Sequence, residues 1–282
     1  MKNANTKSRV SSVSKLRARL LTSWAAVSVL AASLLFTGLL TGCPGTAGGG
    51  TPSVPVDPAA ILKTDGNGKI TGYKCAKEEL PAHLVIPAKI GNEEIKEIDS
   101  WAFSDCTGLT SISLPASLTE ISSSAFSDCT GLTSISLPAS LTTIGEGAFE
   151  GCKSLTSITL PANLTKIDKY TFSDCTGLTS ITLPANLTQI GEYAFYDCKG
   201  LTSVHLPASL TTIDQYAFYG CGGLASAVFE DKNYWKVYDD DSYSGTSTSI
   251  NSSDLDNAAT AAEYLREETG EGGYCDKYWK KN

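Results

Sequence analysis

Residues 109–131 read LTSISLPASLTEISSSAFSDCTG, and four further 23-residue segments repeat this pattern without a gap up to Gly223. Six cysteines, from Cys106 to Cys221, keep the same 23-residue step. A fixed period of 20–50 residues is the signature of an architecture in which similar units stack on one another. One such unit, called a coil below, cannot bury enough apolar surface to fold alone, so stacking is expected to be obligatory.

Each coil combines a strand pattern with a returning arc. Ile112 and Leu114 alternate with hydroxyl residues, as in a half-buried strand. Pro115 is expected to end the strand because it has no N–H to donate. The positions expected to face the core on the returning arc are Leu118, Ile121, Ala125, Phe126 and Cys129, with their equivalents in the other coils.

The repeats are expected to extend over residues 80–229. A more divergent coil precedes residue 109, with about five extra residues after Pro87, and the first half of another coil follows Gly223. In residues 60–79, the turn sequence Asp65-Gly66-Asn67-Gly68 predicts a β-hairpin that covers the first coil.

Residues 230–282 are expected to cover the last coil. Their segment NAATAAEYLREETG has a helical period and predicts a short helix that ends near Gly270. Residues 239–253, which precede it, are rich in Asp and Ser and are expected to form a solvated loop.

The N-terminal residues 1–42 predict an export signal. They contain six basic and no acidic residues, and an apolar run follows Arg19. The sequence Leu40-Thr41-Gly42-Cys43 resembles the lipobox of bacterial lipoproteins, which implies cleavage before Cys43 and acylation of that cysteine. The alternative is a retained transmembrane helix. Residues 43–59 are rich in Gly and Pro and are expected to form a flexible tether.

The charge balance argues against nucleic-acid binding. Removing the six basic residues of the leader leaves 16 basic against 30 acidic residues, a net charge near −14. A body this acidic repels polyanions.

The pattern LxxIxLPxxLxxIxxxAFxxC resembles the BspA-like, or treponemal-type, leucine-rich repeat of bacterial surface proteins. This resemblance implies a leucine-rich repeat solenoid with a parallel β-sheet on one face. It also implies an exported lipoprotein, anchored in the outer membrane and facing the cell surface, that acts as an adhesin for host matrix, host cells or other bacteria. The alternative function is a structural envelope component that associates with copies of itself.

No catalytic, cofactor or metal site is predicted. The chain has two histidines and shows no phosphate-binding loop and no nucleophile elbow. The cysteines are too far apart in sequence for a zinc site, and we expect them to pack as small apolar residues rather than to form bridges. We therefore expect a binding protein, without a small-molecule substrate, rather than an enzyme.

Two surfaces are candidates for binding. The first is the strand face, with three rows of mostly hydroxyl residues that suit an extended or repetitive partner; the alternatives are simple solubility and contact with ice or polysaccharide. The first row contains Thr110, Thr133, Thr156, Thr179 and Thr202, the second Ser111, Ser134, Ser157, Ser180 and Ser203, and the third Ser113, Ser136, Thr159, Thr182 and His205.

The second candidate surface is a cluster of tyrosines on the last three full coils, beside the Ala-Phe pair. Exposed tyrosine is enriched at protein interfaces. The alternative is that these rings shield the coil edges or contact the C-terminal tail. The cluster consists of Tyr170, Tyr193, Tyr196, Tyr216 and Tyr219.

Overall fold

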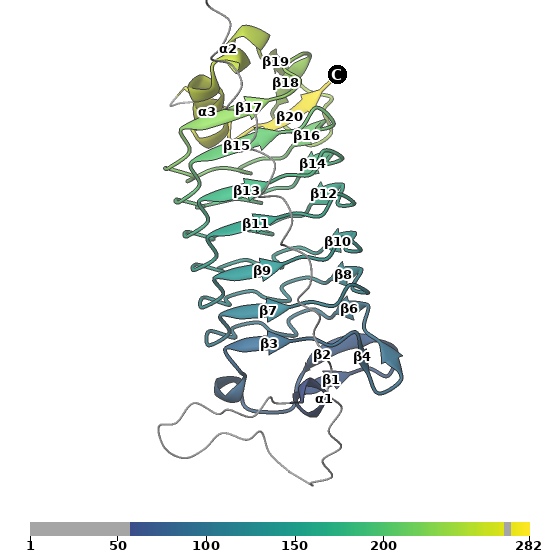
Figure 1. Cartoon of the computed structure of the whole chain (residues 1–282). Helices are drawn as coiled ribbons and strands as arrows, with labels where there is room; N and C mark the ends of the chain where they lie inside the picture. Colours follow the sequence, from purple (N-terminus) through teal and green to yellow (C-terminus); the bar gives the residue numbers. More distant parts are fainter. Residues whose placement is uncertain (1–56, 268–271) are drawn as a thin grey trace, which may run out of the picture. The chain divides into compact units, whose positions relative to one another are not determined.

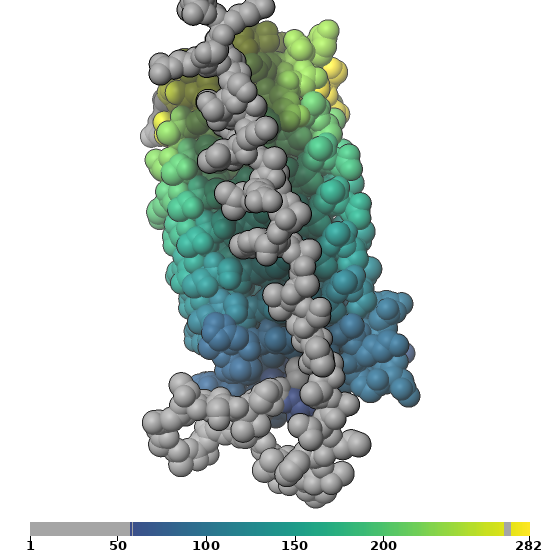
Figure 2. Space-filling view, in the orientation of Figure 1, coloured from purple at the N-terminus to yellow at the C-terminus, as the bar shows by residue number. Residues whose placement is uncertain are grey.

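The computed structural model describes residues 57–267 and 272–282. These residues form about six coils of roughly 23 residues that stack in chain order, seen as successive strands in Figure 1 and as bands of colour in Figure 2. The predicted export signal and Cys43 lie outside the described residues. Within the described part, no helix is long and apolar enough to cross a membrane.

The predicted strand in each coil is present and forms a parallel ladder on one side of the stack. Residues one period apart face each other, so that Ile112 is opposite Ile135 and Ile158 is opposite Ile181. The strands of this ladder are β3 (His83–Val85), β7 (Ser111–Ser113), β9 (Ser134–Ser136), β11 (Ser157–Thr159), β13 (Ser180–Thr182), β15 (Ser203–Leu206) and β17 (Ser226–Phe229).

A second parallel ladder, which the sequence pattern does not predict, runs along the returning arc. Its strands are only two residues long, too short for an alternating pattern to reveal them. They are β6 (Glu97–Ile98), β8 (Glu120–Ile121), β10 (Thr143–Ile144), β12 (Lys166–Ile167), β14 (Gln189–Ile190) and β16 (Thr212–Ile213). The isoleucine of each strand is buried, as predicted from Ile121.

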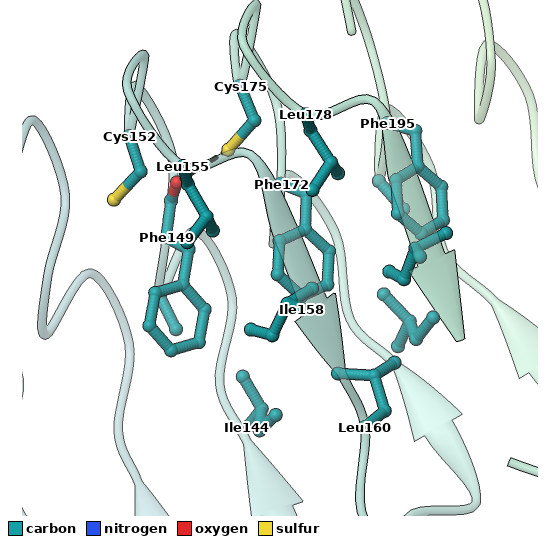
Figure 3. Packing of buried hydrophobic residues seen from close by; sticks show 14 of the residues in the cluster. Ile144, Phe149, Cys152, Leu155, Ile158, Leu160, Phe172, Cys175, Leu178 and Phe195 are labelled. Carbon is teal, nitrogen blue, oxygen red and sulfur yellow. Dashed lines mark hydrogen bonds between the residues drawn. The ribbon is translucent and has the colours of Figure 1, made fainter. Parts of the chain in front are cut away.

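The core between the ladders is a stack of phenylalanines, one per coil. Neighbouring rings are nearly parallel, and their centroids lie 5.0–5.6 Å apart. Figure 3 shows Phe149, Phe172 and Phe195 in this arrangement. Each buried ring contributes about 1.5–3 kcal/mol through burial, with about 0.5–1.5 kcal/mol more from each aromatic pair. The stack consists of Phe103, Phe126, Phe149, Phe172, Phe195 and Phe218.

The six repeat cysteines are buried, unbridged thiols, which confirms the packing role predicted for them. They also link the coils. The Sγ–H of Cys152 donates to the carbonyl oxygen of Phe126 at 3.2 Å, and Cys175 donates to Phe149 at 3.1 Å (Figure 3). Burial raises the pKa of the Cys152 thiol to about 12, so this thiol stays protonated and can donate.

Threonine hydroxyls form two further ladders between coils. On the strand face, the hydroxyl of Thr179 donates to the carbonyl of Thr156 at 3.0 Å, and Thr133, Thr202 and Thr110 donate in the same way to the coil before them. On the returning arc, Thr119, Thr142, Thr188 and Thr211 do the same. These hydroxyls reinforce backbone pairing that the short strands alone leave sparse.

The N-terminal cap contains the predicted hairpin, which is confirmed. β1 (Leu62–Thr64) pairs antiparallel with β2 (Lys69–Tyr73), and β2 then pairs parallel with β6 as the first strand of the second ladder. Gly68, in the turn, has φ +93°, and a side chain there would meet the carbonyl oxygen of Glu94. The remaining elements of this end are α1 (Pro58–Ile61), the 3-10 helix η1 (Lys77–Glu79), and the hairpin β4 (Lys89–Ile90) and β5 (Glu93–Glu94).

The C-terminal cap contains the predicted helix, α3 (Ala258–Arg266), together with strands that were not predicted. β20 (Tyr278–Lys281) pairs with β16, and β18 (Trp235–Tyr238) pairs with β20. The expectation of a loop over residues 239–253 is wrong in part, because β19 (Ser247–Ser249) pairs with β18 and α2 (Ser252–Asp256) begins there.

Aromatic rings close the core at this end. Trp279 of β20 stacks on Phe229 of β17 at 6.0 Å, and Trp235 of β18 meets Phe229 edge-on at 5.5 Å. Arg266 of α3 donates to the carbonyl of Leu224 at 2.6 Å. The tail therefore covers the last coil, because without it the end of the phenylalanine stack and the edge of β16 would contact water.

Both ladders are interrupted between coils 132–154 and 155–177, at a position we call the seam. There β9 does not pair with β11, nor β10 with β12. The amide of Thr156 lies 3.4 Å from the carbonyl of Thr133, against 2.9 Å one coil earlier. The side of the stack that carries the Ala-Phe pairs keeps its backbone hydrogen bonds between these two coils, since the amide of Phe149 donates to the carbonyl of Thr171 at 3.0 Å. The strand-face ladder is interrupted again between β13 and β15.

The buried thiols predict a stability that falls in alkaline solution. Cys152 ionises near 9.0 when unfolded but near 12 when folded, so between these values the unfolded chain binds fewer protons and unfolding is favoured. The difference in free energy of unfolding between the wild type and Cys152→Ala should shrink by about 1.4 kcal/mol per pH unit from pH 9.5 to 10.5. Urea titrations of both chains measure it, and a difference that stays constant would contradict the assignment.

Replacing threonine by valine at different positions of the first strand-face row should change the free energy of unfolding by different amounts. Thr179→Val should lower the free energy of unfolding by about 0.5–1.5 kcal/mol, because it removes the hydroxyl bonded to Thr156. Thr156→Val is the matched control at the seam, where the structure shows no hydroxyl bond to the preceding coil, and should change stability by less than about 0.5 kcal/mol. Equal losses in urea unfolding would show that the hydroxyl bond is not the cause.

Candidate binding surfaces

The strand face presents the predicted hydroxyl residues to solvent. In β11 and β13, Ser157, Thr159, Ser180 and Thr182 are exposed, and the isoleucine between each pair is buried. Because paired strands are in register, the rows run straight from one coil to the next within each paired set. The face therefore offers a flat, uncharged array with a spacing of about 4.8 Å.

The first of the three rows is less available than the sequence suggests. Thr110, Thr133, Thr179 and Thr202 use their hydroxyl protons within the stack. In the second row Ser111 contacts His83 at 2.7 Å. In the part of the chain that the structure describes, Ser134, Ser157, Ser180 and Ser203 make no side-chain hydrogen bond, nor do the hydroxyls of the third row. The outward donors thus come mainly from the second and third rows, with Thr156 alone in the first row.

A shallow depression of about 490 Å³ lies on this face at the seam. Serine and threonine from β9 and β11 line one part of it, and Leu137, Ala139 and Pro161 line the rest. Its position follows from the missing pairing between the two strands, which leaves room between them. Its lining is neutral, and it offers hydroxyls beside apolar carbon.

The two histidines lie on the same face in different coils. His205, in the third row, is exposed, and its Nε2 lies 3.6 Å from the Glu230 carboxylate. His83 contacts Ser111 through Nδ1, a serine–imidazole pair at the surface without a carboxylate on the second ring nitrogen among the described residues. No group of three or more potential metal ligands occurs in the described part of the chain.

The predicted tyrosine cluster is a continuous ladder. Tyr170, Tyr193 and Tyr216 stack with ring centroids 5.1 Å apart and interplanar angles of 3° and 13°. Tyr196 meets Tyr193 edge-on at 5.5 Å, and Tyr219 meets Tyr216 edge-on at 5.8 Å. All five rings are partly exposed. The structure thus brings all five together, and neither the phenylalanine core nor the tail covers them completely.

The backbone under this ladder has an unusual conformation. Tyr170, Tyr193 and Tyr216 have φ values of 55–57°, in the left-handed region, where a side chain costs roughly 1–2 kcal/mol per residue. The same position has a left-handed φ in the other coils too: 55° at Trp101, 54° at Ser124 and 60° at Gly147. The coil geometry therefore imposes this conformation whatever the residue, and the tyrosines are accommodated in spite of the backbone penalty.

The charge around the ladder is mainly negative. Lys169 forms an ion pair with Glu192 at 2.9 Å. Burial, followed by the charge of Glu192, raises the pKa of Tyr170 and of Tyr193 above the ordinary value, so both phenols stay protonated at neutral pH. Burial and three neighbouring carboxylates also raise the pKa of Glu150. The tyrosine ladder thus combines aromatic faces with uncompensated negative charge.

Two further residues, Gly147 and Glu150, flank the Ala-Phe pair of their coil and are not among the residues that the sequence assigns to a site. They become evident when the coils are aligned one above another, so that equivalent repeat positions form columns. Gly147 is where the tyrosine column stops, and Glu150 is the only carboxylate in a column otherwise filled by serine and tyrosine. Both lie next to Tyr170 in the stack.

Comparisons with known proteins agree with this architecture. The model of the BspA type leucine-rich repeat region matches residues 88–185 in six copies. A leucine-rich repeat protein of T. pallidum is 33% identical, with a TM-score of 0.55, over 62% of this chain and 83% of that chain. A leucine-rich cell surface protein of Faecalibacterium prausnitzii A2-165 is 27% identical, with a TM-score of 0.50, over 66% and 56%. Comparison with curated proteins gave no match.

The family region contains β7, β9, β11 and β13 of the strand face but only Tyr170 of the tyrosine ladder. The family region begins in the divergent first coil and ends at residue 185, between β13 and β14 of the fourth full coil, and each complete coil in it keeps the buried phenylalanine and cysteine. The 23-residue step, the ladders and these matches lead to one conclusion: the chain belongs to the BspA type leucine-rich repeat family of bacterial proteins.

Proposed function

We propose that this chain is a lipid-anchored protein of the bacterial cell surface that acts as an adhesin for host matrix, host cells or other bacteria. The observation that carries the proposal is the tyrosine ladder, whose rings remain partly exposed at backbone positions that disfavour them. Tyrosine contributes large contact area and a polar hydroxyl at interfaces, which suits recognition of another protein.

The anchoring part of the proposal rests on the sequence. The lipobox-like Leu40-Thr41-Gly42-Cys43 and the basic leader support export and acylation at Cys43. The Gly- and Pro-rich tether after it would hold the repeats away from the membrane. The related protein of F. prausnitzii is described as a cell surface protein, which supports the same location here.

Contact through the lateral surface fits the geometry better than end-to-end assembly of an envelope layer. β20 covers the edge of β16, and α3 packs against β17, so the C-terminal ends of both ladders are occupied within the chain. The surfaces that repeat along the stack remain available. We therefore favour an adhesin over a self-associating structural component.

Cell-surface display can be tested with the acylation site. Cells that express the wild type should lose the repeat region when intact cells are treated with protease. Cells that express Cys43→Ser should no longer display the repeat region to the protease, because the lipobox that directs cleavage and acylation is gone. Immunoblots of shaved cells and of the medium measure both effects, and a periplasmic protein serves as the control for intact cells.

Adhesion is measured with the same strains on immobilised host matrix proteins and on epithelial monolayers. A strain without the chain and the Cys43→Ser strain should both bind several-fold less than the wild type. Normal adhesion of the deletion strain would exclude the adhesin role. Protection of the chain from protease on intact cells would exclude surface display.

A further inference from the structure

The tyrosine ladder ends abruptly at one ring. Tyr170 stacks on Tyr193 by one face. In the preceding coil, the position beside its other face is Gly147, and the coil before that has Ser124. The next aromatic residue in the column is Trp101, whose side chain is exposed. The column therefore contains a gap of two coils that begins at the face of Tyr170, with a floor of small residues.

A carboxylate lies at this gap. A Cβ on Gly147 would lie 3.1 Å from Oε2 of Glu150 and 3.3 Å from the hydroxyl of Ser124. Glu150 therefore reaches across the glycine, and its charge acts on Tyr170 of the next coil. The charged groups that act on it are Asp128, Asp174 and Glu146, all of which are acidic.

No cation balances this carboxylate within the described residues, and Glu150 forms no ion pair there. Lys169, in the coil after that of Glu150, instead forms an ion pair at 2.9 Å with Glu192 of the coil that follows its own. Burial and the neighbouring acids raise the pKa of Glu150, as expected for a negative charge without a partner. A cation that entered the gap would gain this pairing, and the net charge of the body would attract it.

We propose that the gap beside Tyr170 binds an arginine side chain of a partner protein, with the guanidinium stacked on the Tyr170 ring and paired with the Glu150 carboxylate. The proposal rests on the adhesin function and specifies the chemistry of its partner. A guanidinium is planar, so it can continue a stack of rings, and it carries the charge that Glu150 lacks. A lysine ammonium supplies the charge without the plane, and an aromatic ring supplies the plane without the charge.

The chain itself offers substitutions that the fold should accept. Tyr170→Ser copies Ser124 of an earlier coil, and Glu150→Ser copies Ser127 and Ser173. Gly147→Tyr extends the ladder by one ring, at a φ that three tyrosines already adopt, so the new ring fills the gap beside Tyr170 and displaces the Glu150 carboxylate. Its Cβ meets only the ends of two flexible side chains. Ser157→Ala on the strand face is the control.

The test uses the full-length acylated chain in detergent and fluorescent nonapeptides in which serine alternates with arginine, lysine or citrulline. Citrulline keeps the planar group and removes the charge. Fluorescence anisotropy should show the arginine peptide binding more tightly than the lysine peptide, with the citrulline peptide weakest. Tyr170→Ser, Glu150→Ser and Gly147→Tyr should each weaken arginine-peptide binding by roughly 3- to 30-fold, the size of one cation–π contact or ion pair. Ser157→Ala should leave it unchanged.

Three outcomes of the peptide assay would overturn the proposal. Equal binding of the lysine peptide would show a merely acidic surface, and equal binding of the citrulline peptide would show stacking without charge. Unchanged binding in the three gap variants, with circular dichroism confirming their fold, would place the site elsewhere. Adhesion of the deletion strain tests the adhesin function separately: if that strain adheres poorly while a Gly147→Tyr strain adheres normally, the function stands and this site fails.

Discussion

The stacking of one phenylalanine per coil is the interaction on which the rest of the structure depends. Each ring inside the stack is fully buried between the parallel rings of the coils before and after it, at 5.0–5.6 Å. The thiol of the same coil then bonds back to a phenylalanine carbonyl, as Cys175 does to Phe149. This combination fixes the distance and rotation between coils, so every other position of the repeat also stacks on its equivalent.

Because the step between coils is constant, residues at the same position of the repeat line up in a column on the surface. The function of the surface then depends on how the residue in each column changes from coil to coil. A column of threonines becomes a ladder of hydroxyl bonds, as at Thr179 and Thr202. A column of tyrosines becomes a stack of rings. Where one coil departs from its column, the departure becomes a local feature of the surface. Gly147 and Glu150 are two such departures in the same coil, and together they produce the gap beside Tyr170.

The sequence predicts those parts of the fold that depend on the period and on local turn chemistry. The buried positions Phe126 and Cys129, the strand at Ile112 and the hairpin at Gly66 follow from them. It does not predict β18 and β20, because β20 pairs with β16 and β18 with β20, and these pairings join residues far apart in the chain. The direction of a hydroxyl is equally hidden: Thr179 and Ser180 are both exposed, yet only the threonine bonds inward.

The seam shows how a small change in one column alters the stack. Up to it, Ser140 donates to the carbonyl of Leu118 at 2.6 Å, whereas after it Asn163 donates to Ala139 at 3.0 Å. Both strand ladders break where serine changes to asparagine, and the strand-face ladder breaks again where the column returns to serine at Ser209. Across the seam the strand face keeps only the long backbone bond of Thr156 to Thr133, at 3.4 Å, whereas the side that carries the tyrosine column keeps backbone bonds of 2.8–3.0 Å at Gly147, Phe149 and Gly151. A side chain bound between Glu150 and Tyr170 contacts both coils on this bonded side, so it meets the part of the seam where their relative position is best fixed.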